Sequence, residues 1–268
     1  MKELGMSKKL DYQVFGAEKG HTILFVHGWP DDRSMWRPQL DALAAHYRCV
    51  AVTLPNFGSS SDKTGGCGFA TLVAMLKATI EDVRSPGEKV YLVTHDWGAY
   101  IGYLFEQAHP ELVEKMVALD VGGHTKPTRL KEVGMILGYQ WTLIGCWFIG
   151  GLIPPLGSQL SRALGRVLQM SPSRIAGIHS RFNYPYFFLW MDILMPWRRK
   201  NLLVGYVPRC PTLFIYGMAK PVMFHSSRWL QVLNDNQGAH LGIPDGDHWF
   251  MESHPDQVNS AIRDWIDG

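Results

Sequence analysis

The stretch Lys89-Val-Tyr-Leu-Val-Thr-His-Asp-Trp-Gly-Ala99 joins a short apolar run to a turn and the start of a helix. Lys89–Val93 is short and aliphatic, as strands buried on both faces are, and Ala99–His109 has the periodicity of a helix. Asp96 occupies the turn between them, and Gly98 lets helix and strand pass closely. Such an elbow presents a side chain above the carboxyl edge of a sheet.

An aspartate at this position has two explanations. Asp tolerates the strained, positive-φ backbone of a sharp turn better than most residues, which suits a carboxylate presented for chemistry. The commoner role of an aspartate before a helix is that of an N-cap, which accepts a hydrogen bond from the first turn. The other loops at the same sheet edge decide between the two.

The rest of the chain repeats this alternation of short apolar runs and longer amphipathic ones, which is typical of a mainly parallel α/β sheet. Each parallel crossover needs a helix. Further strands are expected at Thr22–Val26, Arg48–Leu54, Lys115–Val121, Thr212–Tyr216 and His240–Ile243. Further helices are expected at Arg33–Ala45, Phe69–Val83, Ser226–Leu233 and Pro255–Ile266, with Asp32 as an N-cap.

The alternation breaks between Gly122 and Pro208, in a segment rich in Gly, Pro, Trp and Tyr. A structureless loop of that length does not fit a compact domain, so we expect an inserted, largely helical cap. The predicted division is a core of residues 1–121 and 209–268, with a cap of residues 122–208.

Part of this segment is unusually apolar, since no charged residue occurs from Val133 to Ser161. Met135–Leu152 is long enough to span a membrane. Its glycines and the Pro154-Pro155 pair disfavour a continuous span, and a single crossing would separate strands of one sheet. We expect a buried or pocket-lining cap helix, and the alternative is an apolar lid embedded in a membrane surface.

Composition excludes several classes of function. The 26 basic and 24 acidic residues leave a net charge of +2, so no nucleic-acid partner is expected. The N-terminal residues 1–13 lack the apolar core of a signal peptide, which predicts a cytoplasmic protein. Four cysteines lie far apart without zinc-ligand spacing, so no metal site is expected: Cys49, Cys67, Cys146 and Cys210.

Two further loops converge on the sheet edge of Asp96. His27-Gly28-Trp29-Pro30 follows a predicted strand, so its backbone N–H groups can form an oxyanion hole there, although such a motif can also be only a tight turn. Gly246-Asp247-His248-Trp249 follows the last predicted strand. Of the eleven histidines, His248 alone has this placement.

This order of motifs resembles the α/β-hydrolase superfamily over nearly the whole chain. The resemblance implies an α/β-hydrolase fold, with a mostly parallel central sheet flanked by helices and an inserted, mainly helical cap. The usual elbow is G-x-S-x-G, whereas this chain has Thr94-His-Asp-Trp-Gly98, with Asp in place of Ser. H-G-[FW]-P together with H-D-W-G is similar to the branch that contains epoxide hydrolases and haloalkane and fluoroacetate dehalogenases.

The resemblance implies a two-step hydrolysis. Asp96, already ionised near neutral pH, attacks a saturated carbon and forms an alkyl ester. His248 then acts as the base for the water that cleaves this ester. The expected oxyanion donors are the N–H groups of Trp29 and Trp97.

The position of the acid that supports the histidine varies within the superfamily. Much of the superfamily carries it after the penultimate strand, where this chain reads Tyr216-Gly217-Met218-Ala219-Lys220 and has no carboxylate. Some members place the acid after the strand that follows the elbow, which here is Asp120. The alternative for Asp120 is a strand-end residue that caps the next loop.

The two candidate substrate classes, epoxides and haloalkanes, differ in the donor that their leaving group needs. Resembling epoxide hydrolases use two cap phenols, and Asn183-Tyr184-Pro185-Tyr186 partly matches their N-[WY]-Y-R motif. Tyr184 and Tyr186 are therefore candidates, with core packing as their alternative. The indoles of Trp29 and Trp97 suit a halide or an apolar pocket.

The sequence thus predicts a cofactor-free hydrolase with catalytic Asp96, His248 and Asp120, acting with water on a small apolar substrate. An epoxide is favoured, and a haloalkane is the alternative. A hypothesis of another class is a hydrolase-fold binding protein with an incomplete triad, because Lys220 stands where an acid is usual.

Overall fold

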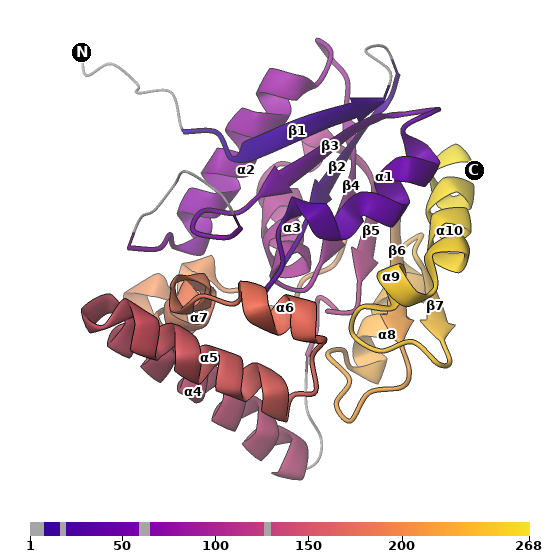
Figure 1. The fold of residues 1–268 in the computed structure, drawn as a ribbon. Coiled ribbons are helices and arrows are strands. Elements are labelled where there is room, and N and C mark those ends of the chain that lie inside the picture. The colour runs from indigo at the N-terminus through magenta and orange to yellow at the C-terminus, as the bar shows by residue number, and fades with distance from the viewer. Residues whose placement is uncertain (1–7, 17–19, 59–64, 126–129) are drawn as a thin grey trace, which may run out of the picture.

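A seven-stranded sheet forms the centre of the computed structural model, which describes residues 8–16, 20–58, 65–125 and 130–268 (Figure 1). The strand order is β1-β3-β2-β4-β5-β6-β7, with β1 antiparallel to β3 and all other pairs parallel. The strands are β1 Asp11–Gly16, β2 Thr22–Val26, β3 Arg48–Thr53, β4 Val90–His95, β5 Val113–Leu119, β6 Thr212–Gly217 and β7 Ala239–Ile243. The expected parallel α/β sheet is confirmed, while residues 1–7 of the segment considered for a signal peptide lie outside the described residues.

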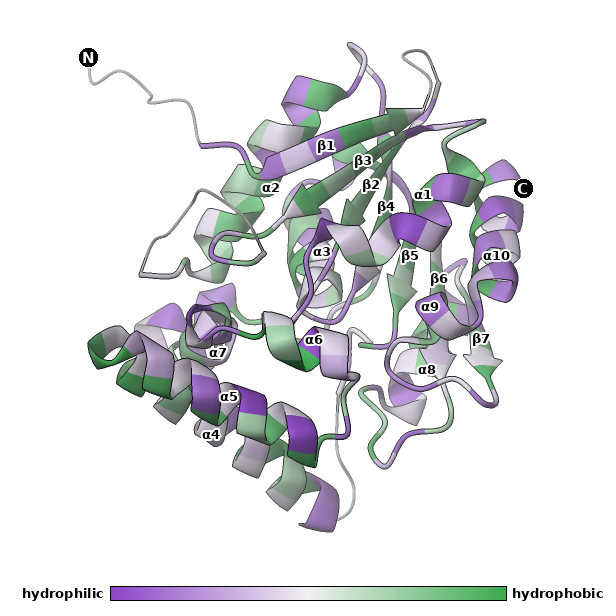
Figure 2. Ribbon diagram, in the orientation of Figure 1, coloured by the Kyte–Doolittle hydropathy of each residue, from purple (hydrophilic) through white to green (hydrophobic). Residues whose placement is uncertain are grey.

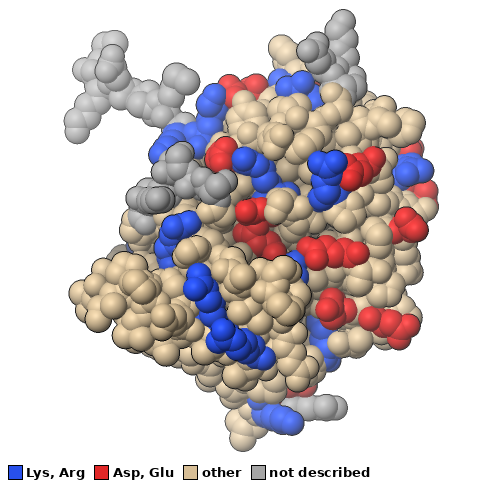
Figure 3. Space-filling model, viewed as in Figure 1, with Lys and Arg blue, Asp and Glu red and all other residues tan. Residues whose placement is uncertain are grey.

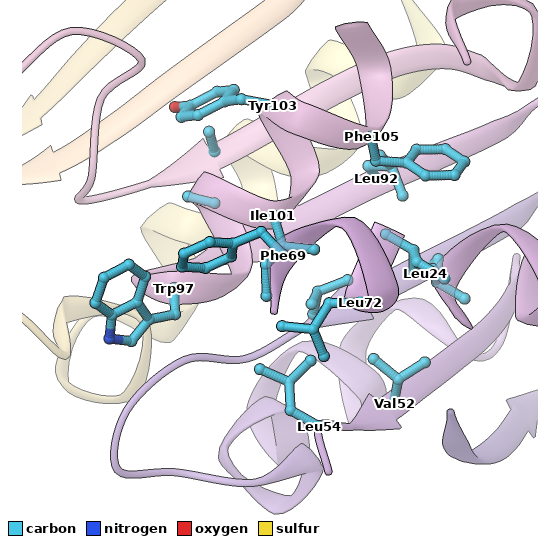
Figure 4. Packing of buried hydrophobic residues seen from close by; sticks show 14 of the residues in the cluster. Leu24, Val52, Leu54, Phe69, Leu72, Leu92, Trp97, Ile101, Tyr103 and Phe105 are labelled. Carbon is cyan, nitrogen blue, oxygen red and sulfur yellow. The ribbon is translucent and has the colours of Figure 1, made fainter. Parts of the chain in front are cut away.

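Helices cover both faces of the sheet and bury alternate side chains of each strand. On one face lie α2 (Phe69–Val83), α3 (Trp97–Ala108) and α8 (Ser227–Asp235). On the other lie α1 (Arg37–Leu43), α9 (Phe250–Ser253) and α10 (Pro255–Asp267). The strands in the middle of the sheet are accordingly apolar along their length (Figure 2). Figure 4 shows the first face, where Leu24, Val52 and Leu92 of the strands meet Leu72, Ile101 and Phe105 of the helices.

The long segment between β5 and β6 is helical. Figure 1 shows it as a separate layer beyond the carboxyl ends of the parallel strands, and we call residues 130–201 the helical insert. Of the predicted cap, residues 126–129 lie outside the described residues. The insert contains α4 Leu130–Leu152, α5 Pro154–Val167, α6 Pro172–Gly177, η3 Ser180–Asn183, α7 Tyr184–Leu194 and η4 Pro196–Asn201.

The apolar helix α4 is pocket-lining but not buried. It is the one helix of the described residues that is long and apolar enough to span a membrane, and only 17% of its apolar window is buried. Its inner side packs against α5, where Gly150 and Gly157 let the two backbones approach closely. Of the expected buried or pocket-lining helix, the pocket-lining part holds, since Ile136 and Tyr139 line cavities, whereas most of α4 is not buried because no other described element covers it.

Two elements differ from the sequence prediction for local reasons. The edge strand β1 was not predicted, because half of its side chains face solvent and its pairing with β3 is supplied only by the fold. The expected helix Arg33–Ala45 divides into η1 (Arg33–Trp36) and α1. Asp32 caps η1 as expected, since its side chain accepts a hydrogen bond of 2.8 Å from the N–H of Ser34.

Candidate active site

Asp96 occupies a strained elbow between β4 and α3. Its backbone lies at φ 53° and ψ −121°, outside the helical and extended regions. A Cβ atom on Gly98 would overlap the carbonyl oxygens of Val26 and His27, so only glycine allows this close approach. A Cβ atom on Gly28 would overlap the carboxylate of Asp96 in the same way. The glycines of both motifs thus hold the two loops against each other.

The elbow accommodates Thr94, the departure from the usual G-x-S-x-G pattern. Thr94 is fully buried at the end of β4, and the neighbouring helix α3 presents Gly102 to it. A Cβ atom on Gly102 would lie only 2.9 Å from Cγ2 of Thr94. The small residue that the contact needs is therefore on the helix rather than on the strand.

The carboxylate of Asp96 faces the backbone of the HGWP loop instead of capping its own helix. Asp96 stands at the N-cap of α3, but its side chain makes no capping hydrogen bond. The N–H of Trp29 donates to Oδ1 of Asp96 at 2.6 Å. The N–H groups of Trp97 and Trp29 both favour the ionised form of this carboxylate. Two backbone N–H groups therefore face the carboxylate of Asp96, an arrangement that could stabilise negative charge on its oxygens.

His248 lies between two carboxylates. Its Nδ1 is 2.5 Å from Oδ2 of Asp120, and its Nε2 is 3.7 Å from Oδ2 of Asp96. Asp120 follows β5 in a positive-φ conformation at 69° and is completely buried. The binding-protein hypothesis would gain support from an Asp120 carboxylate beyond hydrogen-bond reach of His248, and this distance removes that support.

The lysine at the usual position of the acid contacts the same carboxylate. Nζ of Lys220 forms an ion pair with Oδ1 of Asp120, and only 5% of the lysine side chain is exposed. The N–H of Gly217 donates to Oδ1 of Asp120 at 3.3 Å. Sequence reasoning considered Lys220 only as a missing acid and did not predict this contact, because the two residues are a hundred positions apart.

Burial and neighbouring charges set the protonation of the three groups. Burial raises the pKa of Asp96, against the opposing effect of His248 and the two N–H donors. Burial alone would raise the pKa of Asp120, but His248 and Lys220 overcome it and lower the pKa to about 2. Burial would lower the pKa of His248, but the carboxylates of Asp120 and Asp96 raise it above its ordinary value, with Lys220 opposing them.

A cavity of about 180 Å³ joins these groups to the helical insert. Asp96 and His248 line its core side, and Tyr139 of α4 and Tyr186 of α7 line the opposite side. The rings of the two tyrosines meet edge to face, with their centroids 5.9 Å apart. Burial raises the pKa of Tyr139 to about 12 and that of Tyr186 well above its ordinary range, so both phenols keep their protons at neutral pH.

Of the two tyrosines expected from the sequence, the structure brings only Tyr186 to the cavity. Tyr184 lies outside the cavity, where its ring packs on Phe57 of the core and Phe188 of α7, and its buried hydroxyl has no hydrogen-bond partner among the described residues. Because Tyr184 opens α7 and Tyr186 lies two residues later, they face different sides of the helix. Tyr139 was not predicted, since nothing around it in the sequence marks its role.

Asn183 connects the insert to the oxyanion loop. Its Oδ1 accepts a hydrogen bond of 2.9 Å from the indole N–H of Trp29. Its Nδ2 donates to the carbonyl oxygen of Leu143 and to Oγ of Ser161, at 3.2 and 2.9 Å. Asn183 is fully buried. The asparagine of the partial tyrosine motif thus positions Trp29 over the site.

A second cavity, of about 540 Å³, also reaches Asp96. It is lined by Trp97 and Tyr100 of the core and by residues of α4, α7 and the chain after η4. Within the described residues, the indole N–H of Trp97 is buried and makes no hydrogen bond of full geometry, although the hydroxyl of Tyr186 lies close enough to interact with it. A buried donor next to a carboxylate is available to an anionic or developing-anion ligand.

Comparisons with known proteins agree with this architecture. Residues 23–261 match the alpha/beta hydrolase family, so the chain belongs to that family. Within the family it is similar to epoxide hydrolases: 22% identical to epoxide hydrolase 1 of Caenorhabditis elegans, over 96% of this chain and 68% of the relative. It is 24% identical to epoxide hydrolase 3 of Xenopus tropicalis, over 99% and 76%. A haloalkane dehalogenase variant from Bradyrhizobium elkanii shares the fold, with a TM-score of 0.73 and 19% identity over 96% of this chain and 92% of that one.

Proposed function

We propose that the protein is an epoxide hydrolase that opens small apolar epoxides through an ester on Asp96, with residues 122–208 acting as the cap. One observation carries the proposal: a single cavity is lined by Asp96 and His248 on the core side and by Tyr139 and Tyr186 on the insert side. The nucleophile, the base and two proton donors therefore face the same small volume. The similarity to epoxide hydrolases supports this assignment.

In the first step, Oδ2 of Asp96 attacks a ring carbon of the epoxide, because Oδ1 is engaged by the N–H of Trp29. The C–O bond of the epoxide breaks as the new ester bond forms. The departing oxygen takes a proton from Tyr139 or Tyr186, since an alkoxide is too basic to leave unaided. The product is a β-hydroxyalkyl ester of Asp96.

In the second step, water attacks the ester carbonyl carbon while Nε2 of His248 takes its proton. The oxyanion that forms on the side chain of Asp96 is stabilised by the N–H groups of Trp29 and Trp97. Asp120 holds the imidazole in the required tautomer and stabilises the imidazolium. Collapse of the intermediate releases a diol, and the proton on His248 returns to the phenolate.

Intact-mass measurement of His248→Ala tests this mechanism, because the ester then accumulates. Incubation with styrene oxide should add the mass of one whole epoxide, since ring opening loses no atom. The matched control His248→Ala/Asp96→Ala should gain no mass. Absence of any adduct from styrene oxide and terminal alkyl epoxides, together with absence of wild-type turnover, would contradict the proposal.

A haloalkane dehalogenase is the second candidate, favoured by the indole N–H of Trp97, which is buried near Asp96 without a hydrogen bond of full geometry among the described residues. A halide leaves as a stable anion and needs an N–H donor rather than a proton. A bromoalkane would add only its alkyl group to His248→Ala and release bromide. An adduct from bromoalkanes but not from epoxides would assign this second function.

A further inference from the structure

Exposed apolar side chains concentrate on one part of the molecule. Among the described residues, all the large hydrophobic side chains that are exposed belong to the insert and the few residues after it, except Val14, Met218 and Met223. On the surface of a soluble protein, exposed large hydrophobic side chains normally occur singly. Those of the insert and its C-terminal continuation are Leu130, Met135, Leu137, Trp141, Phe148, Ile149, Leu152, Ile153, Leu156, Leu160, Val167, Leu168, Leu194, Trp197, Val204 and Val207.

On α4 four of these residues lie along one side of the helix, interrupted once by the buried Ile144. Leu137, Trp141, Phe148 and Leu152 follow one another at spacings of four and seven, which places them in line along a helix. Their exposed fractions are 38%, 49%, 53% and 86%. The buried residues of α4 are Leu143, Ile144 and Cys146, and the helix packs on α5, η3 and α7. The apolar stripe of α4 therefore faces away from the protein.

The charge of the insert complements an anionic surface. Residues 130–207 contain eight basic and two acidic side chains, whereas the rest of the sequence has more acidic than basic residues. One of the two acids, Asp192, is buried and paired with Arg198. Figure 3 shows the insert, at lower left, as a broad uncharged area crossed by a row of Lys and Arg side chains.

We propose that the outer face of the insert is a binding surface for membranes that contain anionic lipids. Trp141 and Trp197 would lie at the level of the headgroups, where tryptophan is enriched, and the neighbouring Arg199 and Lys200 would contact lipid phosphates. α4 lies in the plane of the interface rather than across the bilayer, because its inner side is fixed to α5 and α7.

With the outer face of the insert on a membrane, the larger of the two cavities that reach Asp96 would open toward the lipid. Ile136 of α4, Leu189 and Ile193 of α7, and Val204 line the cavity of about 540 Å³ that reaches Asp96, and Val204 is 72% exposed. An apolar compound dissolved in the bilayer could then enter without crossing water. The binding surface itself does not depend on the reaction proposed for Asp96.

Co-sedimentation of the full chain with vesicles tests the proposal. We expect the wild type to bind vesicles of phosphatidylcholine and phosphatidylserine at least tenfold more tightly than vesicles of phosphatidylcholine alone. Trp141→Ser/Phe148→Ser should weaken binding to the mixed vesicles at least tenfold. Removing one basic residue should weaken vesicle binding roughly fivefold. Arg199→Glu/Lys200→Glu reverses two charges and should therefore weaken binding to the mixed vesicles by more than roughly 25-fold.

Met218→Ser is the matched control, because it removes an equally exposed apolar side chain from the core and should leave vesicle binding unchanged. Circular dichroism and melting temperature verify that each variant is folded. Wild-type protein that fails to sediment with either vesicle would overturn the proposal. So would a wild-type dimer, seen by sedimentation velocity, that Trp141→Ser/Phe148→Ser converts into monomer, because a second copy would then cover this face.

Discussion

At the scale of single residues, Asp120 is shared by two cationic partners. One oxygen of Asp120 faces His248 and the other is paired with Lys220. The positive charge of Lys220 therefore weakens the stabilisation of protonated His248 by this carboxylate. Asp247 favours the charged form of Lys220, Lys220 in turn helps burial to lower the pKa of His225, and the ring of Phe224 lies 5.6 Å from Nζ of Lys220. Lys220 is thus a positioning residue that limits the rise in the pKa of His248.

Lys220→Met should shift the acidic limb of the pH–rate profile for epoxide hydrolysis upward by about one pH unit. The sign follows from charge: removing the ammonium stabilises protonated His248, and the neutral base is then present only at higher pH. The measurement is kcat against pH. Lys220→Arg retains the charge and should keep the wild-type profile, whereas an unchanged profile in Lys220→Met would refute this role.

The two cavity tyrosines make a second prediction at this scale. Tyr186→Phe and Tyr139→Phe should each lower kcat for an epoxide by roughly 10- to 100-fold, which is less than the roughly 100- to 10,000-fold contribution of a single general acid because the other phenol remains. Tyr184→Phe is the matched control, since Tyr184 lies outside the cavity and its hydroxyl has no hydrogen-bond partner in the part of the chain that the structure describes. Equal losses in all three variants would indicate a packing effect rather than proton donation.

At the scale of elements, α6 links the insert to the catalytic loops. Arg174 forms ion pairs of 2.6 Å with Asp31 of the loop after β2 and with Glu252 of α9. Its guanidinium also lies over the ring of Trp249, 4.3 Å from the ring centroid. Because Trp249 stacks edge-on against His248, this one arginine connects the insert to the loop that carries the base.

Arg174→Ala should destabilise the protein by about 2–4 kcal/mol, since it leaves Asp31 without its partner in a site where both side chains are largely buried. Thermal and urea unfolding measure the change. Arg37→Ala is the control, because its ion pair with Asp41 is exposed and should contribute almost nothing. Similar losses of unfolding free energy in both variants would show that the ion pairs of Arg174 contribute no more to stability than an exposed ion pair does.

At the scale of the whole molecule, the layers of the fold protect most of the cysteines. Cys49 and Cys210 are buried, and burial raises the pKa of each thiol to about 12. Cys146 is also buried, and burial raises its pKa as well. Cys67 is partly exposed.

Titration with a thiol reagent should therefore show one fast-reacting cysteine in the native protein and four after unfolding. Cys67→Ser should abolish the fast phase and leave the three slow thiols unchanged. Fast reaction of two or more thiols in the Cys67→Ser protein would show that the core opens more readily than its packing indicates.

The sequence by itself determined the parallel sheet, because a strand buried on both faces needs a short apolar run and a parallel crossover needs a helix. It also identified the elbow of Asp96 and the glycine at position 98, since a helix and a strand that pass this closely accept no side chain there. These are local requirements, and residues that are adjacent in the sequence determine each of them.

Only the tertiary structure decided which distant side chains meet. The contact of Lys220 with Asp120, the presence of Tyr139 rather than Tyr184 in the cavity and the outward stripe of α4 all depend on how separate elements are packed. Helical periodicity shows that a face is apolar, but it does not show whether another layer covers that face. Long-range distances arise when the chain folds, so no short sequence pattern encodes them.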